Sequence, residues 1–470
     1  MVFSSFVFLF GFLPLLLLLY FLAKRRVKNS VLLVFSVLFY AWGEPLWVAV
    51  LLLSVCGGWI GGTQLERYRD RPASKLVLAF AVAFQILLLF YFKYIGFLLD
   101  TLRSITSIDI QVETPGLPIG ISFFTFQVIS YLIDVYRKEA PALSSFSKLL
   151  LYISLFPQLV AGPIVRYADV QDQLTHRRVT LEGFSQGVIR FSIGLGKKVV
   201  LANSLSDGVT LFLDGDLHDL SVMGAWFGII LFALQIYFDF SGYSDMAIGL
   251  GYMYGFRFRE NFDYPYISRS ATEFWRRWNM SVGQFFRDYV YIPLGGNRVR
   301  PMFNLFVVWF LTGLWHGASW NYVLWGLYFG VFIALEKRFL HRLLSTLPAV
   351  VSHLYFLVVV LVGWVLFYFE SLSRGLMYLR IMFGMAAVPL TDMQLLIHFR
   401  NHLFLLTVAC IAASPLPRLF HGKTSDYLRL RPAGALYVNL LIPTLCLGVL
   451  TISTLLLVGK TYTPFFYFRF

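Results

Sequence analysis

The stretch FSSFVFLFGFLPLLLLLYFLAKRR, Phe3 to Arg26, joins a long apolar run directly to a basic cluster. An apolar run of about twenty residues is what a helix needs to cross about 30 Å of hydrocarbon. No basic segment precedes the run, which argues against a cleavable signal peptide. Because Lys and Arg gather on the cytoplasmic side of membrane helices, the cluster Lys24-Arg25-Arg26 predicts a first transmembrane helix with its N-terminus outside.

The rest of the 470 residues has the same character, with 58% hydrophobic, 18% aromatic and 14% charged residues. The hydrophobic share is higher, and the charged share lower, than in a soluble globular chain. Further apolar stretches lie near residues 31–55, 77–98, 119–135, 147–163, 186–205, 222–252, 303–335, 354–371, 400–415 and 435–458. We therefore expect an all-α integral membrane protein with about eleven transmembrane helices. With no repeat and no long linker in the sequence, residues 1–470 are expected to form a single polytopic domain.

The net charge of +14 and the three cysteines give no sign of a nucleic-acid partner, a disulfide framework or a metal site. Lys and Arg occur in short clusters between apolar runs, so the positive-inside rule explains the charge and no nucleic-acid partner is expected. Cys56, Cys410 and Cys446 lie in separate apolar runs without CxxC spacing. The sequence therefore predicts neither a disulfide framework nor a metal site.

Residues 261–300 are unusual because charged and aromatic side chains are both frequent there. Ser270, followed three residues later by Glu273, matches a capping box and predicts that a helix begins at this point. One apolar stripe of that helix would hold Phe274, Trp278, Val282 and Phe285. Such a helix would lie in the membrane interface or dip into the protein instead of spanning it. The residues Gly295-Gly296-Asn297 predict a turn after it.

The stretch LTGLWHGASW, Leu311 to Trp320, holds one histidine in an otherwise apolar segment. Without His316, it would be typical of the middle of a membrane helix, where an imidazole is costly. Of the eight histidines, His316 alone lies deep in an apolar segment. Interhelical hydrogen bonding and catalysis are both consistent with this residue taken alone.

A second polar group interrupts the apolar stretch LQIYFDFSGYSDMAIGLGYMYG. Gln235 and Asp239 would share a helix face, whereas the following Phe-Ser-Gly suggests a break that turns Asp245 elsewhere. For both carboxylates we favour helix capping or pairing with arginines of residues 257–300 over direct catalysis. The segment GLGKK, Gly194 to Lys198, lacks the spacing of a phosphate-binding loop.

Several arginines accompany the aromatic residues of this region: Arg257, Arg259, Arg276, Arg277, Arg287, Arg298 and Arg300. They could hold a phosphate-bearing donor through paired hydrogen bonds. Contact with anionic lipid headgroups is the alternative, and charge alone favours it.

Four motifs together resemble the bacterial branch of the membrane-bound O-acyltransferase family: EFWRRWNMSVGQFFRDYVYIPLGGN, YFDFSGYSD, LVAGPIVR and LTGLWHGASWNYVLWG. The resemblance covers nearly the whole chain. It implies a bundle of about eleven transmembrane helices, with interfacial or re-entrant helices, around a central funnel or tunnel, and a catalytic core at about 115–335. The family's nearly invariant histidine corresponds to His316, and its second polar position to Asn279, where bacterial relatives often have histidine. Asn279 cannot act as a base, so His316 would transfer the proton alone.

The resemblance implies an enzyme that moves an acyl group, most simply acetyl, from a cytoplasmic thioester such as acetyl-CoA to O-acetylate a cell-envelope or extracellular polysaccharide, for example an alginate-like exopolysaccharide. Peptidoglycan O-acetylation and D-alanyl transfer to teichoic acid are the alternatives within the family. A periplasmic or extracellular acetyltransferase of SGNH type would be the protein partner. The location would be the bacterial cytoplasmic (inner) membrane, with no bound cofactor or metal.

The resemblance also gives expected roles to particular residues. The residues expected to bind the donor are Arg276, Arg277, Arg298, Trp275, Trp278 and Trp315. Asp239 and Asp245 are expected to support the site without touching the substrates. The C-terminal stretch GKTYTPFFYFRF is by composition an aromatic anchor at the membrane interface. It also resembles a terminal motif in which Tyr467 would carry the acyl group transiently.

Two other classes of function remain open from the sequence. Intramembrane Asp239, Asp245 and His316 could line an ion path in a transporter. Secondary transporters often have paired halves with matching broken helices, and this sequence has no such symmetry. A scaffold that recruits soluble acetylating enzymes is the third interpretation. The motif match favours the enzyme.

Overall fold

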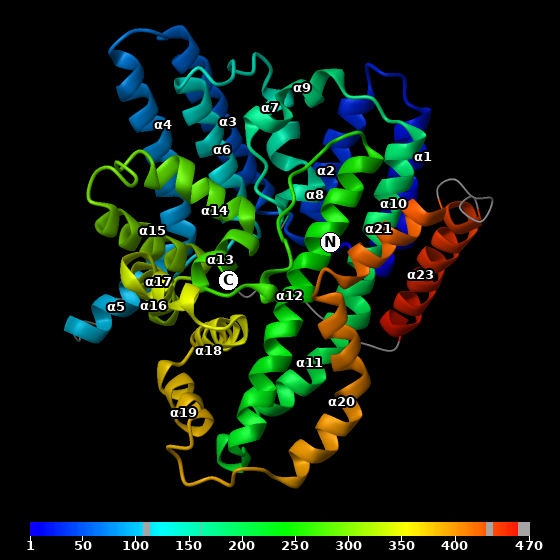
Figure 1. Cartoon of the computed structure of the whole chain (residues 1–470). Helices are drawn as coiled ribbons and strands as arrows, with labels where there is room; N and C mark the ends of the chain where they lie inside the picture. Colours follow the sequence, from blue (N-terminus) through cyan, green and yellow to red (C-terminus); the bar gives the residue numbers. More distant parts are fainter. Residues whose placement is uncertain (107–112, 161, 429–435, 459–470) are drawn as a thin grey trace. The chain divides into compact units, whose positions relative to one another are not determined.

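The computed structural model describes residues 1–106, 113–160, 162–428 and 436–458, and in these ranges every regular element is a helix. This confirms the all-α class. Figure 1 shows the helices coloured along the sequence. The chain divides into two compact units: Met1–Phe191 with Met246–Arg259, and Ser192–Asp245 with Glu260–Phe470. Two of the boundaries fall within helices α10 and α12, and the third falls in the segment between α12 and η6. Whether the whole chain acts as a single domain stays a prediction.

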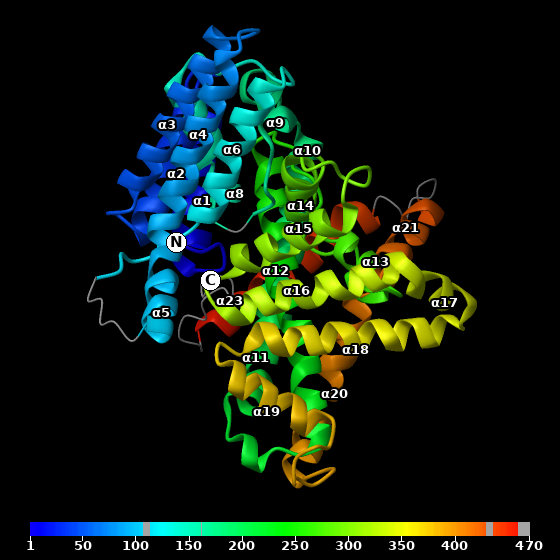
Figure 2. The ribbon, with the colours of Figure 1, turned by 90° about the vertical axis from the view of Figure 1, so that its left-hand side faces the viewer.

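The first unit contains the N-terminal helices. They are η1 (Val7–Phe12), α1 (Leu13–Leu22), α2 (Lys28–Gly43), α3 (Val48–Arg67), α4 (Ala73–Leu89), η2 (Phe90–Tyr94), α5 (Ile95–Thr106), α6 (Ile121–Tyr136), α7 (Phe146–Ser154), α8 (Phe156–Leu159), α9 (Tyr167–His176) and the start of α10 (Leu181–Gly196). Helices α3, α4 and α6 lie side by side (Figure 2). Gln85 of α4 donates to the Ser54 carbonyl at 2.9 Å and accepts from the Ser54 hydroxyl at 2.6 Å, so a buried polar pair joins α3 to α4.

The second unit contains the segments in which the sequence predicted the functional residues. Its helices are η3 (Lys197–Ala202), α11 (Asn203–Val209), η4 (Thr210–Asp214), η5 (Leu217–Asp219), α12 (Val222–Met253, to Asp245), η6 (Pro265–Ile267), α13 (Ala271–Arg277), α14 (Met280–Phe286), η7 (Arg287–Tyr291), α15 (Pro301–His316), α16 (Trp320–Leu335), η8 (Glu336–Leu340), α17 (His341–Thr346), α18 (Ala349–Tyr368), α19 (Leu372–Met382), α20 (Met393–Ala412), α21 (Leu416–Leu428), η9 (Tyr437–Leu441) and α23 (Ile442–Val458). Within this unit, α16 packs between α15 and α18 (Figure 2).

Several helices have the length and apolar composition of a membrane span. Among the described residues there are six: Val48–Arg67, Ala73–Thr106, Val222–Met253, Ala349–Tyr368, Met393–Ala412 and Tyr437–Val458. Three shorter apolar helices cover Val7–Leu22, Lys28–Gly43 and Ile121–Tyr136. The chain is therefore a multi-pass membrane protein. The expected number of about eleven crossings stays a prediction.

Helix α12 continues through the position where the sequence predicted a break. It is helical from Val222 to Met253, so the expected break after Asp239 was wrong. The glycine that suggested the break serves close packing instead. A methyl group on Gly242 would lie 2.7 Å from the carbonyl oxygen of Gly194 in α10. Small residues at such a contact let the backbones of two membrane helices approach closely.

Candidate active site

His316 is the last residue of α15, at a sharp turn between two helices. Gly317 leaves the helical conformation with φ −172° and ψ 151°, and α16 begins at Trp320. The two helices pack tightly, because a methyl group on Gly313 would lie 3.1 Å from the carbonyl carbon of Tyr322. The imidazole therefore lies at a helix end, whereas the residues around it had been typical of the middle of a membrane helix.

Aromatic rings surround the His316 side chain, which is only 4% exposed. Its ring centroid lies 4.6 Å from that of Trp315, 4.8 Å from Trp325 in α16 and 5.2 Å from Phe367 in α18. All three contacts are close to edge-to-face, with interplanar angles of 72° to 83°. Aromatic pairs in this geometry are individually favourable. Three helices thus determine where the imidazole lies.

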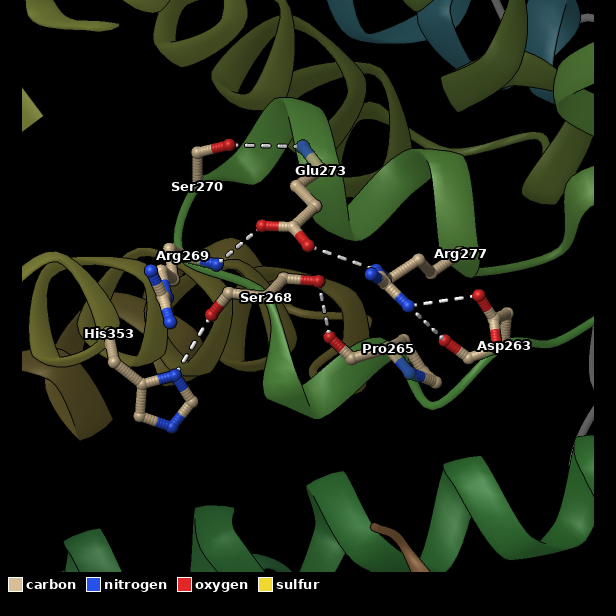
Figure 3. Close-up of polar contacts among 8 residues, drawn as sticks. All are labelled: Asp263, Pro265, Ser268, Arg269, Ser270, Glu273, Arg277 and His353. Carbon is tan, nitrogen blue, oxygen red and sulfur yellow. Dashed lines mark hydrogen bonds and ion pairs between the residues drawn. The ribbon is translucent and has the colours of Figure 1, made fainter. Parts of the chain in front are cut away.

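The predicted helix start at Ser270 is confirmed. The Ser270 hydroxyl accepts from the Glu273 amide at 3.0 Å, and the Glu273 carboxylate accepts from the Arg269 amide at 3.0 Å (Figure 3). The first contact satisfies an N–H group that a helix cannot bond internally at its first turn, and the second ties the preceding residue to the helix. The local pattern was therefore sufficient to locate the N-terminus of α13.

The expectation of one continuous helix after Ser270 was wrong, because the segment breaks at Asn279. Helix α13 ends at Arg277 and α14 begins at Met280, while Asn279 adopts φ 45° and ψ 52°. Asparagine tolerates this left-handed conformation better than most residues. Asn261 holds the break: its carbonyl accepts from the Met280 amide and its Oδ1 accepts from the Ser281 amide, each at 3.0 Å.

Asn279 is 4% exposed, and within the described part of the chain its Oδ1 has no hydrogen-bond partner. A row of ring contacts connects its neighbour Trp278 to the histidine. The ring centroids of Trp278 and Trp364 are 5.0 Å apart, those of Trp364 and Phe367 5.5 Å, and those of Phe367 and His316 5.2 Å. We call these four side chains the aromatic row. The residue before Asn279 is therefore connected to His316 through two intervening rings of α18.

The expected apolar stripe of the interfacial segment is buried, as predicted. Its members Phe274, Trp278, Val282 and Phe285 each have less than a tenth of their surface exposed. Trp275 lies on another side of α13, where its ring contacts Trp309, Trp325 and Phe329 of α15 and α16. The expected donor-binding role of the tryptophans stays a prediction.

The ring of Tyr266 contacts that of Trp278, and its hydroxyl makes two buried hydrogen bonds. It donates to the Ala233 carbonyl of α12 at 2.6 Å and accepts from Trp364 Nε1 at 3.2 Å. Burial raises the pKa of Tyr266 well above its ordinary value. The hydroxyl therefore remains protonated and serves as a structural donor between α12 and α18.

The three arginines expected to bind the donor have different surroundings. Arg277 donates to the Glu273 carboxylate at 3.1 Å, and to the Asp263 carboxylate at 2.9 Å and its carbonyl at 3.1 Å (Figure 3). Arg276 is exposed, and so is Arg298, which follows a turn where Gly295 and Gly296 have positive φ. The guanidinium of Arg277 is thus occupied by the protein itself. Donor binding by any of the three stays a prediction.

Asp239 and Asp245 of α12 pair with adjacent lysines. Asp239 forms an ion pair with Lys198, and Asp245 with Lys197 at 2.8 Å. Asp239, Asp245 and Lys198 are buried. The sequence had suggested arginines of residues 257–300 as partners, and the GLGKK segment had not been connected with these carboxylates. Two lysines in an apolar helix were the signal that they needed buried partners. A supporting role for both carboxylates stays a prediction.

Asn321 of α16 was not recognised from the sequence. It is 2% exposed, and both atoms of its amide lack hydrogen-bond partners within the described ranges. Asn321 and Trp325 are one helical turn apart and share a face of α16. The indole Nε1 of Trp325 likewise has no partner there. Unpaired buried polar groups are costly, and Trp325 packs against His316, so the Asn321 amide and the Trp325 Nε1 are candidate contacts of a polar ligand.

Tyr467 lies outside the described residues. Among the residues described, no three His, Cys, Asp or Glu side chains are grouped so that they could hold a metal ion.

Known proteins share these segments. Residues 121–379, which include Asn279 and His316, match the membrane-bound O-acyltransferase family (MBOAT). The chain is 39% identical over 496 residues to a probable alginate O-acetylase AlgI of Pseudomonas putida, with 100% of each chain covered. A peptidoglycan O-acetyltransferase of Helicobacter pylori is 31% identical over 84% of this chain and 82% of its own length. A teichoic acid D-alanyltransferase of Bacillus subtilis is 27% identical over 47% of this chain and 59% of its own length.

Proposed function

The chain belongs to the membrane-bound O-acyltransferase family, and on this premise we propose that it moves an acetyl group from a cytoplasmic thioester toward the hydroxyl groups of an alginate-like polysaccharide outside the inner membrane. The alginate O-acetylase relative supports this acceptor because it matches over the full length of both chains. The peptidoglycan and teichoic acid enzymes match at lower identity. Peptidoglycan and teichoic acid are therefore the second choice of acceptor for this chain.

The observation that carries the proposal is the buried imidazole of His316 at the α15–α16 turn, packed against the rings of Trp325 and Phe367. The aromatic row connects this imidazole to Trp278, the chain neighbour of Asn279. His316 takes the proton of the acceptor hydroxyl while that oxygen attacks the thioester carbonyl. The tetrahedral oxyanion then collapses and expels the thiolate, which receives the proton from the imidazolium. General base catalysis of this kind contributes about 10²- to 10⁴-fold to a rate.

Asn279 supports the same step as a hydrogen-bond donor. Its Nδ2 group donates to the oxygen of the thioester as negative charge develops there, a role in which one donor contributes about 10²- to 10³-fold. The break between α13 and α14 presents this amide as part of a rigid turn held by Asn261. The polar atoms of Asn321 and Trp325 would complete the contacts of the bound thioester.

Acetyl-CoA is the proposed donor, and exposed Arg276 and Arg298 are the proposed contacts of its phosphates. A periplasmic acetyltransferase of SGNH type would pass the group to the polymer. Tyr467 would carry the acetyl group between the two proteins as an ester. Replacement of Tyr467 by Phe removes only the oxygen, so polymer acetylation should stop while donor binding persists. Full acetylation by this variant would leave membrane anchoring as the role of the tail.

The test uses an alginate-producing host whose own membrane O-acetylase gene is deleted. The wild-type chain should restore acetyl esters on secreted alginate, measured by proton NMR, and the His316→Ala variant should not. His341→Ala is the matched control, because His341 is exposed at the start of α17. Membrane abundance of each variant is measured in parallel. Acetylation at the wild-type level by His316→Ala would exclude catalysis by this residue and favour a scaffold.

A further inference from the structure

Glu336 is a buried carboxylate that the chemistry described above does not use. It is the first residue of η8, directly after α16, and only 2% of it is exposed. Its Oε1 accepts from the Ala271 amide at 2.8 Å and from the Tyr355 hydroxyl at 3.0 Å. Its Oε2 accepts from the Thr272 amide at 2.8 Å and from the Thr272 hydroxyl at 2.5 Å.

These contacts place Glu336 at the N-terminus of α13. The first N–H groups of a helix have no partner inside it, and the helix dipole favours a negative charge there. Glu336 accepts from the first two amides of α13, and Ser270 accepts from the third. A residue 65 positions away in the sequence thus completes the cap of this helix.

Helix α13 depends on such anchors because it has only seven residues. Helices shorter than about twelve residues are marginal alone, so tertiary contacts decide where they lie. Besides Glu336, Trp275 anchors α13, with its ring 5.4 Å from Trp325 and 4.9 Å from Phe329. Both anchors join α13 to α16, which begins four residues after His316. Asn279 follows α13 after one intervening residue.

We propose that Glu336 is a positioning residue, which clamps α13 to the α15–α16 hairpin and thereby sets the position of the Asn279 amide relative to the His316 imidazole. The inference rests on the proposed function for its catalytic part. The carboxylate touches neither substrate nor reacting atoms. It acts through α13, and the alternative is that it contributes only to the stability of the fold.

Two variants test the clamp. Glu336→Gln keeps the size but turns an NH₂ group toward backbone or hydroxyl donors, so at least one acceptor contact is lost. Glu336→Asp keeps the charge and shortens the reach, and it serves as the second variant where the glutamine variant folds poorly. The matched control is Glu66→Gln in the first unit, whose carboxylate also accepts from a backbone amide, that of Ala142, at 3.2 Å.

The first measurement is hydrogen–deuterium exchange of the purified protein in detergent, read from peptides that cover residues 268–279. Both Glu336 variants should exchange faster at the first turn of α13, and Glu66→Gln should not. The second measurement is the kinetics of acetyl transfer from acetyl-CoA. The kcat should fall about ten- to a hundredfold, since small misplacements of catalytic groups have such effects, while the KM for acetyl-CoA stays within about twofold.

Three outcomes would overturn the clamp as a positioning device. Unchanged exchange in the 268–279 peptides would show that Glu336 does not hold α13. Faster exchange with unchanged kcat would show that the position of α13 does not matter for turnover. An equal loss of kcat in Glu66→Gln would point to general destabilisation. The exchange measurement needs no activity, so it remains decisive about the clamp even where wild-type protein transfers no acetyl group and the proposed function fails.

Discussion

The indole ring of Trp325 lies 4.8 Å from the imidazole ring of His316, centroid to centroid, at an interplanar angle of 79°. Trp325 also contacts Trp275 of α13 and Phe367 of α18. Trp325 therefore contacts the candidate base, the helix that precedes Asn279 (α13) and the helix that supplies two members of the aromatic row (α18). We therefore expect the orientation of the imidazole to depend on this indole.

Replacement of Trp325 by Phe should lower kcat about tenfold or more, because the smaller ring leaves space in which His316 can rotate. The KM for acetyl-CoA should change much less than kcat. Trp226→Phe is the control, since the Trp226 indole bonds to the Met382 carbonyl at 2.7 Å and is not part of the aromatic row. Steady-state kinetics of both variants check the prediction. A wild-type kcat in Trp325→Phe would show that the imidazole needs no such support.

Arg276 and Arg277 should respond differently to the same substitution. Arg276→Gln removes an exposed charge and should raise the KM for acetyl-CoA about tenfold at low ionic strength, with kcat nearly unchanged. Arg277→Gln breaks the contacts with Asp263 and Glu273 and should lower the melting temperature by a few degrees. Kinetics and thermal unfolding of both variants form the test. A KM effect confined to Arg277→Gln would reverse the assignment.

Asn279 combines a backbone role with a proposed chemical role, and two substitutions separate them. Asn279→Ala should destabilise the protein by about 1 kcal/mol, because alanine is strained in the left-handed conformation, whereas Asn279→Gly should fold well. Both variants lose the amide, so both should lose about 10²-fold in kcat. Thermal unfolding and kinetics are measured side by side. Normal turnover in the glycine variant would leave only the backbone role.

The buried pair Lys198–Asp239 should show strong coupling in a double-mutant cycle. Asp239→Asn alone leaves the buried Lys198 charge without its carboxylate. Loss of one partner of a buried ion pair lowers the free energy of unfolding by about 3–5 kcal/mol. Lys198→Met alone should cost a similar amount. The double variant should be more stable than either single variant, as measured by thermal unfolding in detergent. Additive losses would mean that the two side chains do not depend on each other.

Local patterns in the sequence were sufficient for several features of this protein. The long apolar runs predicted an all-α membrane protein, and Ser270 with Glu273 predicted the start of α13, because these signals depend on neighbours within one or two turns. The apolar context singled out His316, the family resemblance made it the candidate base, and that role stays a prediction. The buried stripe from Phe274 to Phe285 followed from helical spacing even though the helix breaks within it.

Only the tertiary structure decided which distant residues stabilise these helices and the break between α13 and α14. The break at Asn279 depends on Asn261, which accepts from the Ser281 amide 20 positions along the chain. The lysine partners of Asp239 and Asp245, and the cap that Glu336 provides for α13, likewise join segments far apart in the sequence. A buried carboxylate or an asparagine announces by its type that it needs a partner. Which partner it meets depends on how the helices pack, since sequence spacing carries no information about distances between helices.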